Sequence, residues 1–285
     1  MKDLDTIAEE LRYSIWDPAG NITALVESDV RIEDQPSAAA KIMERHPEIE
    51  QVGFVRFSPE SPEFQVQLRM AGGEFCGNAS MSAAALYILK YFSFDFQDPI
   101  PVKLRVSGAS DLIFCLVEPG SLSTVNVSIR IPEALSIRKE PLSVGRMICE
   151  LPVVRMEGIS HIVVTPRSDF YSLLENRGMA EETVKNWCVR LAADGLGIMF
   201  YNDAGDVCKL DPLVYVPACG TTFWENSCAS GTAAVGMWLS DENASPVSLT
   251  IREPGGCIRV NADRAKAETF LNEEIRFLVF YPGVE

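Results

Sequence analysis

The chain lacks any concentration of positive charge. It has 25 lysines and arginines against 40 aspartates and glutamates in 285 residues, so its net charge is -15. Nucleic acids and anionic membranes are bound through clustered Lys and Arg, and this composition argues against both partners. The chain also has no apolar run as long as a membrane span, and residues 1–10 are acidic and do not resemble a secretory signal. We therefore expect a cytoplasmic protein.

Several motifs that are typical of proteins with a bound nucleotide, metal or cofactor are also missing. No G-x-G-x-x-G or P-loop pattern is present, and the eight cysteines include no C-x-x-C pair. Neither Lys103 nor Lys209 has a context that indicates a Schiff base with pyridoxal phosphate. The sequence thus predicts no metal and no cofactor, and it indicates that most of the cysteines are small core residues in a reducing compartment.

Two loops stand out because they resemble each other. Cys76 lies in the segment 74–80 and Cys228 in the segment 225–232, and each loop leads into an apolar, small-residue stretch that predicts a buried helix. A thiol at a helix N-terminus is made reactive, because unsatisfied N–H groups and the helix dipole favour the thiolate. The same N–H groups form a seat for an anion such as a carboxylate.

The pattern of elements repeats once along the chain, which predicts an α+β fold of two similar domains. We expect an N-terminal domain over 1–131, completed by the last strand at 270–285, and a C-terminal domain over 132–269. Half-buried antiparallel strands are expected around each predicted cysteine helix. Helices are expected at 37–45, 76–92, 181–193 and after residue 228, and strands at 22–26, 52–57, 64–70, 102–106, 112–117, 125–131, 153–156, 162–165, 198–201, 213–216, 247–252, 257–261 and 275–281.

These features together resemble the diaminopimelate epimerase family of cofactor-independent amino-acid racemases, which includes proline racemases and phenazine-biosynthesis isomerases. The resemblance spans nearly the whole chain, and the cysteine loops are its most specific part. It is carried by Pro18-Ala19-Gly20-Asn21, Glu50-Gln51-Val52-Gly53, Cys76-Gly77-Asn78, Gly158-Ile159-Ser160-His161 and Cys228-Ala229-Ser230-Gly231-Thr232. It implies a curved antiparallel sheet around a central helix in each domain, with the active site in the cleft between them.

The chemistry that the resemblance implies is inversion of an α-carbon. One base removes the α-proton and an acid on the opposite face returns another, and thiols suit both roles because their pKa lies near working pH. We therefore interpret Cys76 and Cys228 as the catalytic pair. The substrate carboxylate would be held by backbone N–H groups, as in an oxyanion hole. The residues expected to bind substrate are Asn21, Glu50, Gln67, Gly77, Asn78, Glu225, Ser230, Gly231 and Thr232. His161 is expected to hold a strand edge by hydrogen bonding.

The departures from the family pattern bear on the substrate. Diaminopimelate epimerases hold the distal groups of their substrate with asparagines and a Glu-Arg pair, and this chain has Cys219-Gly220 in place of that pair. Without the Arg, a second carboxylate has no evident bidentate partner. The segment 220–228 instead resembles that of histidine racemases of opine-metallophore pathways. In this segment, Phe223 and Trp224 could line a pocket for an imidazole or simply pack in the core. We expect an amino-acid substrate with a single carboxylate, and a homodimer is compatible with the sequence.

Three alternatives stay open from the sequence. The first is diaminopimelate epimerase itself. The second is a phenazine-type isomerase or dehydratase on the same fold, although such relatives typically lack one of the two cysteines. The third is a thiol redox protein or a catalytically silent binding protein.

Overall fold

The computed structural model describes residues 11–92, 96–121, 123–203 and 207–283. The expectation about the acidic N-terminus falls on residues 1–10, outside the described residues. The chain forms two compact units, one made of Met1–Ile129 with Asn272–Glu285 and the other of Arg130–Leu271. That two separate domains meet at residue 131 stays a prediction. Within the described ranges, no helix has the length and apolar character needed to span a membrane.

The strands of the first unit form a closed barrel. They pair in the order β1-β2-β3-β4-β5-β6-β7-β16, and β1 also pairs with β16 and so closes the ring. As far as the residues of this unit are described, closure leaves no unpaired sheet edge. The strands are β1 (Tyr13–Pro18), β2 (Thr23–Val26), β3 (Gln51–Phe57), β4 (Val66–Met70), β5 (Ile100–Val106), β6 (Ile113–Pro119), β7 (Thr124–Arg130) and β16 (Glu268–Tyr281).

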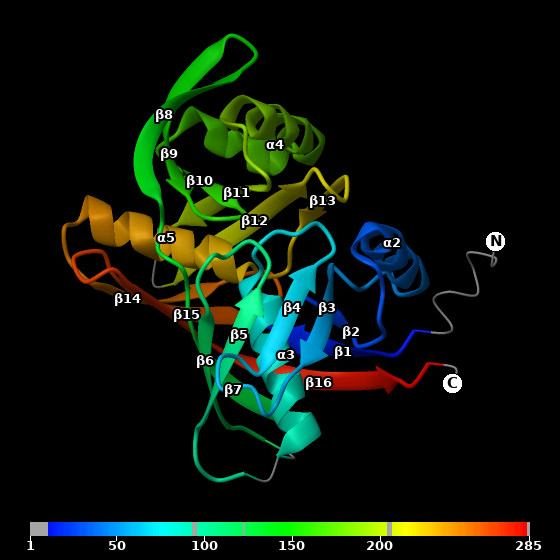
Figure 1. Ribbon diagram of the computed structural model, residues 1–285. Helices are drawn as coiled ribbons and strands as arrows, with labels where there is room; N and C mark the ends of the chain where they lie inside the picture. The colour runs from blue at the N-terminus through cyan, green and yellow to red at the C-terminus, as the bar shows by residue number, and fades with distance from the viewer. Residues whose placement is uncertain (1–10, 93–95, 122, 204–206, 284–285) are drawn as a thin grey trace. The chain divides into compact units, whose positions relative to one another are not determined.

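A buried helix, α3 (Gly77–Tyr91), packs against β1 to β6 of this barrel (Figure 1). Its residues from Gly77 to Ile88 are all buried. A helix that is apolar or small on every side is suited to such a site, because it can be surrounded by sheet. The short helix α2 (Gln35–Arg45), preceded by a 3-10 turn at Ile32–Asp34, packs on β3.

The second unit is a sheet covered on two faces. After the start of β16 its strand order is β15-β14-β12-β11-β10-β9-β8, and β13 pairs with β12. Its helices are α4 (Arg177–Leu191) and α5 (Ala229–Glu242), with a 3-10 segment at Asp169–Glu175. Its strands are β8 (Ser136–Val144), β9 (Met147–Arg155), β10 (Ser160–Val164), β11 (Leu196–Asn202), β12 (Cys208–Val216), β13 (Thr221–Trp224), β14 (Val247–Arg252) and β15 (Cys257–Asp263).

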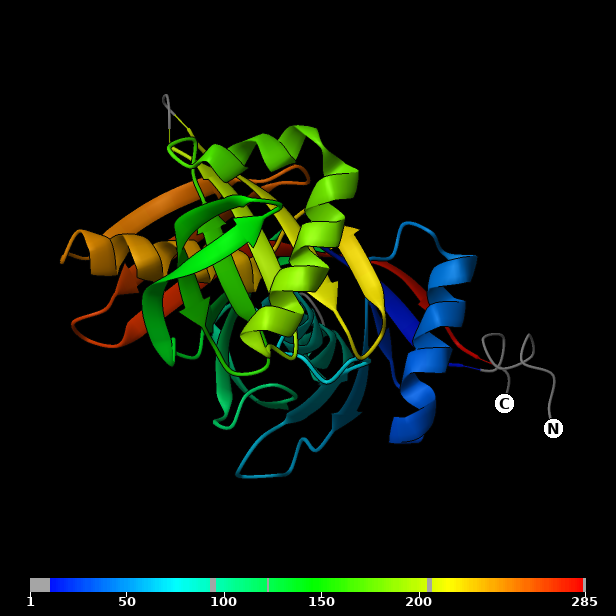
Figure 2. The ribbon, with the colours of Figure 1, turned by 90° about the horizontal axis from the view of Figure 1, so that it is seen from above.

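Alternation along β11 shows that α4 and α5 lie on opposite faces of this sheet. Ile198 and Phe200 belong to the core cluster that includes Trp187 of α4. The alternate residues of β11 face the other helix: Met199 lies against Gly231 of α5, and Tyr201 contacts Trp238 of α5. Successive side chains of a strand point to opposite faces, so β11 is buried from both sides. Figures 1 and 2 show the two helices on either side of these strands.

The α+β class is confirmed as a sheet-dominated, barrel-like structure, but the expectation of purely antiparallel sheets is wrong. Among the strand pairs formed by described residues, these four are parallel: β2 with β3, β4 with β5, β10 with β11, and β12 with β14. In each pair the connecting chain carries one of the helices α2, α3, α4 and α5. Parallel strands need such a crossover, whereas a short turn suffices for antiparallel ones. Each of the α-helices in the described ranges is therefore part of a crossover connection.

Candidate active site

Cys76 caps the N-terminus of α3. Its backbone is extended, with φ -134°, and its Sγ accepts a hydrogen bond from the N–H of Ala79 at 3.3 Å. Its carbonyl accepts from the N–H and the hydroxyl of Ser80, at 3.1 and 2.7 Å. An N-cap side chain normally accepts from an N–H of the first helical turn, and here a sulfur atom takes that place. The side chain is partly exposed.

A chain of polar side chains leads away from Cys76. The Cys76 thiol donates to Oε1 of Gln51, whose Nε2 donates to Oδ1 of Asn21 at 2.6 Å. Nδ2 of Asn21 in turn donates to Oε2 of Glu50, also at 2.6 Å. Asn21 is fully buried, so these bonds satisfy amide groups that would otherwise be costly to bury. The structure thus joins the predicted residues Asn21 and Glu50 to Cys76.

Gln51 is the one residue of this hydrogen-bonded network that the sequence does not predict as a site residue. It lies in the segment 50–53, for which the sequence predicts a role only for Glu50. A polar residue at the first position of a strand gives no local sign that its side chain meets a cysteine 25 positions later.

Gln67, in contrast, lies apart from the cysteine loop. It is exposed on β4, on the opposite side of the strand from the buried Val66 and Leu68. Its partner on β3 is Arg56, which is five residues beyond Gln51. At about 3.3 Å per residue this separation along the strand is roughly 16 Å. The structure therefore does not bring Gln67 to the Cys76 network.

Cys228 caps α5 in the same way as Cys76 caps α3. Its backbone has φ -138°, and its Sγ accepts from the N–H of Gly231 at 3.4 Å. Its carbonyl accepts from the N–H of Thr232 at 2.8 Å. Two of the predicted carboxylate donors, Gly231 and Thr232, therefore already have backbone N–H acceptors within their own loop.

Cys228 differs from Cys76 in being buried next to carboxylates. Its side chain has 4% exposure, and its N–H donates to Oε2 of Glu253 at 2.7 Å. Burial raises the pKa of the Cys228 thiol well above its ordinary value, and the nearby charges of Glu225 and Glu253 raise it further. At neutral pH the group is thus a thiol. The expected residue Glu225 does lie beside the cysteine, and Glu253 is a neighbour that sequence reasoning missed.

His161 also contacts the Cys228 loop, and it does not lie at a strand edge as expected. It lies on β10, which pairs with both β9 and β11, so its strand is internal. Its Nε2 shares a hydrogen bond of 3.0 Å with the hydroxyl of Ser230. Burial lowers the pKa of His161 to about 3, and the ring is neutral at physiological pH. A neutral imidazole behind Ser230 orients that hydroxyl, which lies 3.6 Å from the Sγ of Cys228.

Trp224 packs away from the cysteine. Its ring stacks on Phe200 with centroids 5.7 Å apart, and its indole N–H donates to Glu181 of α4 at 3.0 Å. The guanidinium of Arg177 lies 4.8 Å above the same ring. The sequence left open whether Trp224 lines a substrate pocket or packs, and these contacts favour packing on the α4 side of the sheet.

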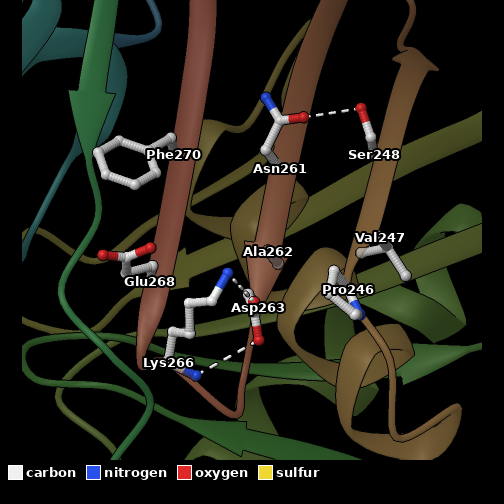
Figure 3. A pocket seen from close by; sticks show the side chains of 9 residues that line it. All are labelled: Pro246, Val247, Ser248, Asn261, Ala262, Asp263, Lys266, Glu268 and Phe270. Carbon is white, nitrogen blue, oxygen red and sulfur yellow. Dashed lines mark hydrogen bonds and ion pairs between the residues drawn. The ribbon is translucent and has the colours of Figure 1, made fainter.

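A surface pocket of the second unit lies over β14, β15 and the start of β16 (Figure 3). Its polar groups bond to each other: the Ser248 hydroxyl donates to Asn261 at 2.7 Å, and Lys266 pairs with Asp263 at 3.0 Å. None of the predicted site residues lines it. The two cysteine loops are therefore the better candidates for a reactive site.

Known proteins resemble this chain over most of its length. A family model described as the histidine racemase CntK N-terminal domain matches residues 10–275. A histidine racemase of Staphylococcus aureus is 28% identical over 256 residues, which is 89% of this chain and 89% of that protein. A histidine racemase of Fusobacterium nucleatum is 33% identical over 239 residues, which is 83% of this chain and 84% of that protein.

Solved structures share the fold at low sequence identity. A hydroxyproline epimerase from Agrobacterium vitis superposes with a TM-score of 0.64 at 10% identity, over 95% of this chain and 91% of that one. A PhzF-family phenazine biosynthesis protein from Bacillus anthracis superposes with a TM-score of 0.62 at 10% identity, over 95% of this chain and 97% of that one. The sequence matches and the shared fold agree, and the chain belongs to the histidine racemase family and is an isomerase.

Proposed function

We propose that this protein interconverts L- and D-histidine without a cofactor, with Cys76 and Cys228 as the acid and base on one α-carbon. The observation that carries the proposal is the pair of matching helix caps. In each, the cysteine Sγ accepts an N–H hydrogen bond from the residue three positions on. Such a contact favours a thiolate and leaves the other N–H groups of the first turn directed out of the helix end.

The proposed reaction moves two protons and leaves no net change. The thiolate of Cys76 removes the α-proton of one enantiomer, and the buried thiol of Cys228 delivers its own proton to the opposite face of the carbanion. The enzyme then carries its proton on Cys76, so the roles are reversed for the other direction. This requires the two cysteine loops to face a single substrate.

The carbanion needs stabilisation where its charge develops, which is on the α-carboxylate. We assign this role to the first helical turns, through the N–H groups of Gly77 and Asn78 on α3 and of Ser230 on α5. Hydrogen bonds aimed at developing charge are worth roughly 3 kcal/mol each by mutational precedent. Fixed N–H groups at a helix end provide them without reorganisation.

Histidine is proposed as the substrate because of the named relatives and two negative groups near the cysteines. Glu50 accepts from Asn21, at the end of the chain of bonds from Cys76, and Glu225 lies beside Cys228. Both carboxylates suit a substrate with an ammonium group and an imidazole. The absence of a Glu-Arg pair at positions 219 and 220 leaves a second substrate carboxylate without a bidentate partner. Reduced thiols fit the cytoplasm, where we expect the protein to act.

The test is a substrate screen with the purified full chain and no added pyridoxal phosphate. Each common L-amino acid, diaminopimelate and trans-4-hydroxy-L-proline is incubated under reducing conditions, and the stereoisomers are separated by chiral chromatography. We expect D-histidine to form and the other compounds to react far more slowly. Formation of another D-amino acid in place of D-histidine would refute the substrate assignment, and no racemisation at all would refute the activity.

A further inference from the structure

The turn that follows β14 holds the Cys228 loop. The turn is closed by a hydrogen bond from the N–H of Glu253 to the carbonyl of Gly256, at 2.9 Å. Within it, the N–H of Gly255 donates to the carbonyl of Asn226 at 2.8 Å. The chain just before Cys228 is therefore fixed to this turn by its backbone.

The side chain of Glu253 fixes the loop at two more points. Oε2 accepts from the N–H of Cys228 at 2.7 Å, and Oε1 accepts from the hydroxyl of Thr232. These two residues are the N-cap and the fourth residue of α5, so one carboxylate spans the whole first turn. Glu253 has 4% exposure, and both of its oxygens are used.

The first cysteine loop handles the equivalent position differently. Ser80 lies four residues after Cys76, as Thr232 does after Cys228, but its hydroxyl donates to the carbonyl of Cys76 itself at 2.7 Å. The hydroxyl at this position thus bonds within its own loop in the first case and to the carboxylate of Glu253 in the second.

A carboxylate in this position also acts on Cys228 by its charge. Burial raises the pKa of Glu253 to about 8; its hydrogen bonds from Thr232 and Cys228 act against this rise, and Asp211 of β12 adds to it. The other groups facing Cys228 are the carboxylate of Glu225 and the hydroxyl of Ser230, with neutral His161 behind it. Glu253 is therefore mostly protonated at neutral pH and ionised in the higher pH range in which Cys228 loses its proton. In that range its negative charge next to the thiol disfavours the thiolate.

We propose that Glu253 is a positioning residue that seats the Cys228 loop and, once it is ionised, disfavours the thiolate of Cys228. This rests on the catalytic role proposed for Cys228. The residue does not touch the substrate. It acts through the cysteine, by fixing its N–H and, when ionised, by its negative charge.

The charge and the hydrogen bonds can be separated with Glu253→Gln. The amide oxygen can accept from the N–H of Cys228 and the amide N–H can donate to Thr232, since a hydroxyl is both donor and acceptor. With cysteine labelled at Cβ with 13C, and Cys228 assigned by comparison with Cys228→Ser, we expect its resonance to titrate about one pH unit lower than in the wild type. Glu242→Gln, at the far end of α5 and about 21 Å from the cap, is the matched control and should not move it.

The positioning role is tested by activity. Glu253→Ala removes both hydrogen bonds, and we expect at least a tenfold loss in kcat for histidine racemisation, with a smaller change in KM. Glu253→Gln should recover most of that kcat. A Cys228 resonance that titrates at the wild-type pH in Glu253→Gln would overturn the proposal, as would full kcat in Glu253→Ala. If the wild type does not racemise histidine, the proposed function fails, but the titration still decides the effect of Glu253 on Cys228.

Discussion

At the scale of single residues, Cys76 and Cys228 share a helix cap but have different surroundings. Cys76 is partly exposed and donates to the neutral amide of Gln51. Cys228 is buried between the carboxylates of Glu225 and Glu253. A thiolate is tolerated more readily beside an amide and solvent than in a buried site next to carboxyl groups, because burial and any negative charge there both raise the pKa of the thiol. This difference is why we assign the resting proton to Cys228.

Replacement of either cysteine by serine should abolish most of the activity. A serine hydroxyl is too weak an acid to form the base, so we expect Cys76→Ser and Cys228→Ser each to lower kcat for histidine racemisation by about 10²- to 10⁴-fold. Chiral chromatography of the product measures this. Cys257→Ser is the control, because Cys257 is an exposed cysteine of the same chain, and it should leave kcat within a factor of two. Wild-type activity in either of the first two variants would contradict the two-base mechanism.

His161 predicts a pH dependence of stability. Its pKa is lowered from 6.5 to about 3 in the folded protein, so between these values the unfolded chain binds a proton that the folded chain does not. Stability from this group is therefore complete above pH 6.5 and falls as the pH drops toward 3, by at most about 1.4 kcal/mol per pH unit.

The variant His161→Gln removes this group while keeping a partner for Ser230. Urea unfolding at pH 7 and at pH 5 should show a smaller loss in free energy of unfolding for the variant than for the wild type. An equal loss of unfolding free energy in both proteins between pH 7 and pH 5 would show that His161 is protonated in the folded state at pH 5.

At the scale of elements, the first turn of α5 depends on a residue without a side chain. A Cβ on Gly231 would lie far inside van der Waals contact with Sδ of Met199 on β11, and 3.1 Å from the Sγ of Cys228. With alanine at this position, the buried side chain of Met199 or the helix end would have to move.

Gly231→Ala should consequently lower both stability and activity. We expect a loss of about 1–3 kcal/mol in free energy of unfolding from overpacking, and a reduced kcat because the cap is displaced. Gly178→Ala is the matched control in α4: a Cβ there meets nothing within 4 Å, and the helix gains from alanine by up to about 1 kcal/mol. Equal stability of the two variants would contradict the close packing of α5 on β11.

The elements that sequence predicts well are those with a local signal. The helix expected at 76–92 is α3 (Gly77–Tyr91), and that expected at 181–193 is α4 (Arg177–Leu191), which begins four residues earlier. Strand β8 (Ser136–Val144) was not predicted, because its consecutive charged residues 138–140 and Pro141 are typical of a linker. The parallel pairings were also missed, since strand direction depends on how distant segments pair.

The candidate site shows the same limit more sharply. The cysteine loops are visible in sequence because glycine, asparagine, serine and threonine surround each thiol before an apolar helix. Glu253 is not, because it directly precedes the segment Pro254-Gly255-Gly256, whose only local signal is a turn. Its partners Cys228 and Thr232 precede it by 25 and 21 positions. A buried carboxylate that bonds to a distant loop leaves no pattern of its own.

At the scale of the whole molecule, the proposed two-base mechanism draws one cysteine from each unit. One unit contributes Cys76 with the chain of side chains to Glu50, and the other contributes Cys228 with Glu225 and Glu253. Each unit has one of the two helices that are capped by a cysteine of the proposed pair, and the mechanism needs both cysteines, one on each face of the carbon. The proposed activity therefore belongs to the full chain and not to either unit alone.

The most direct test of this two-base claim is the initial fate of deuterium when L-histidine is racemised in heavy water. The acid that protonates the product face has exchanged with solvent, whereas the base on the substrate face receives protium from the substrate. Mass spectrometry of the separated enantiomers should therefore find deuterium at the α-carbon of D-histidine from the first turnovers, and almost none in the recovered L-histidine. Deuterium appearing equally fast in both enantiomers, or D-histidine that retains the substrate's protium, would contradict the mechanism.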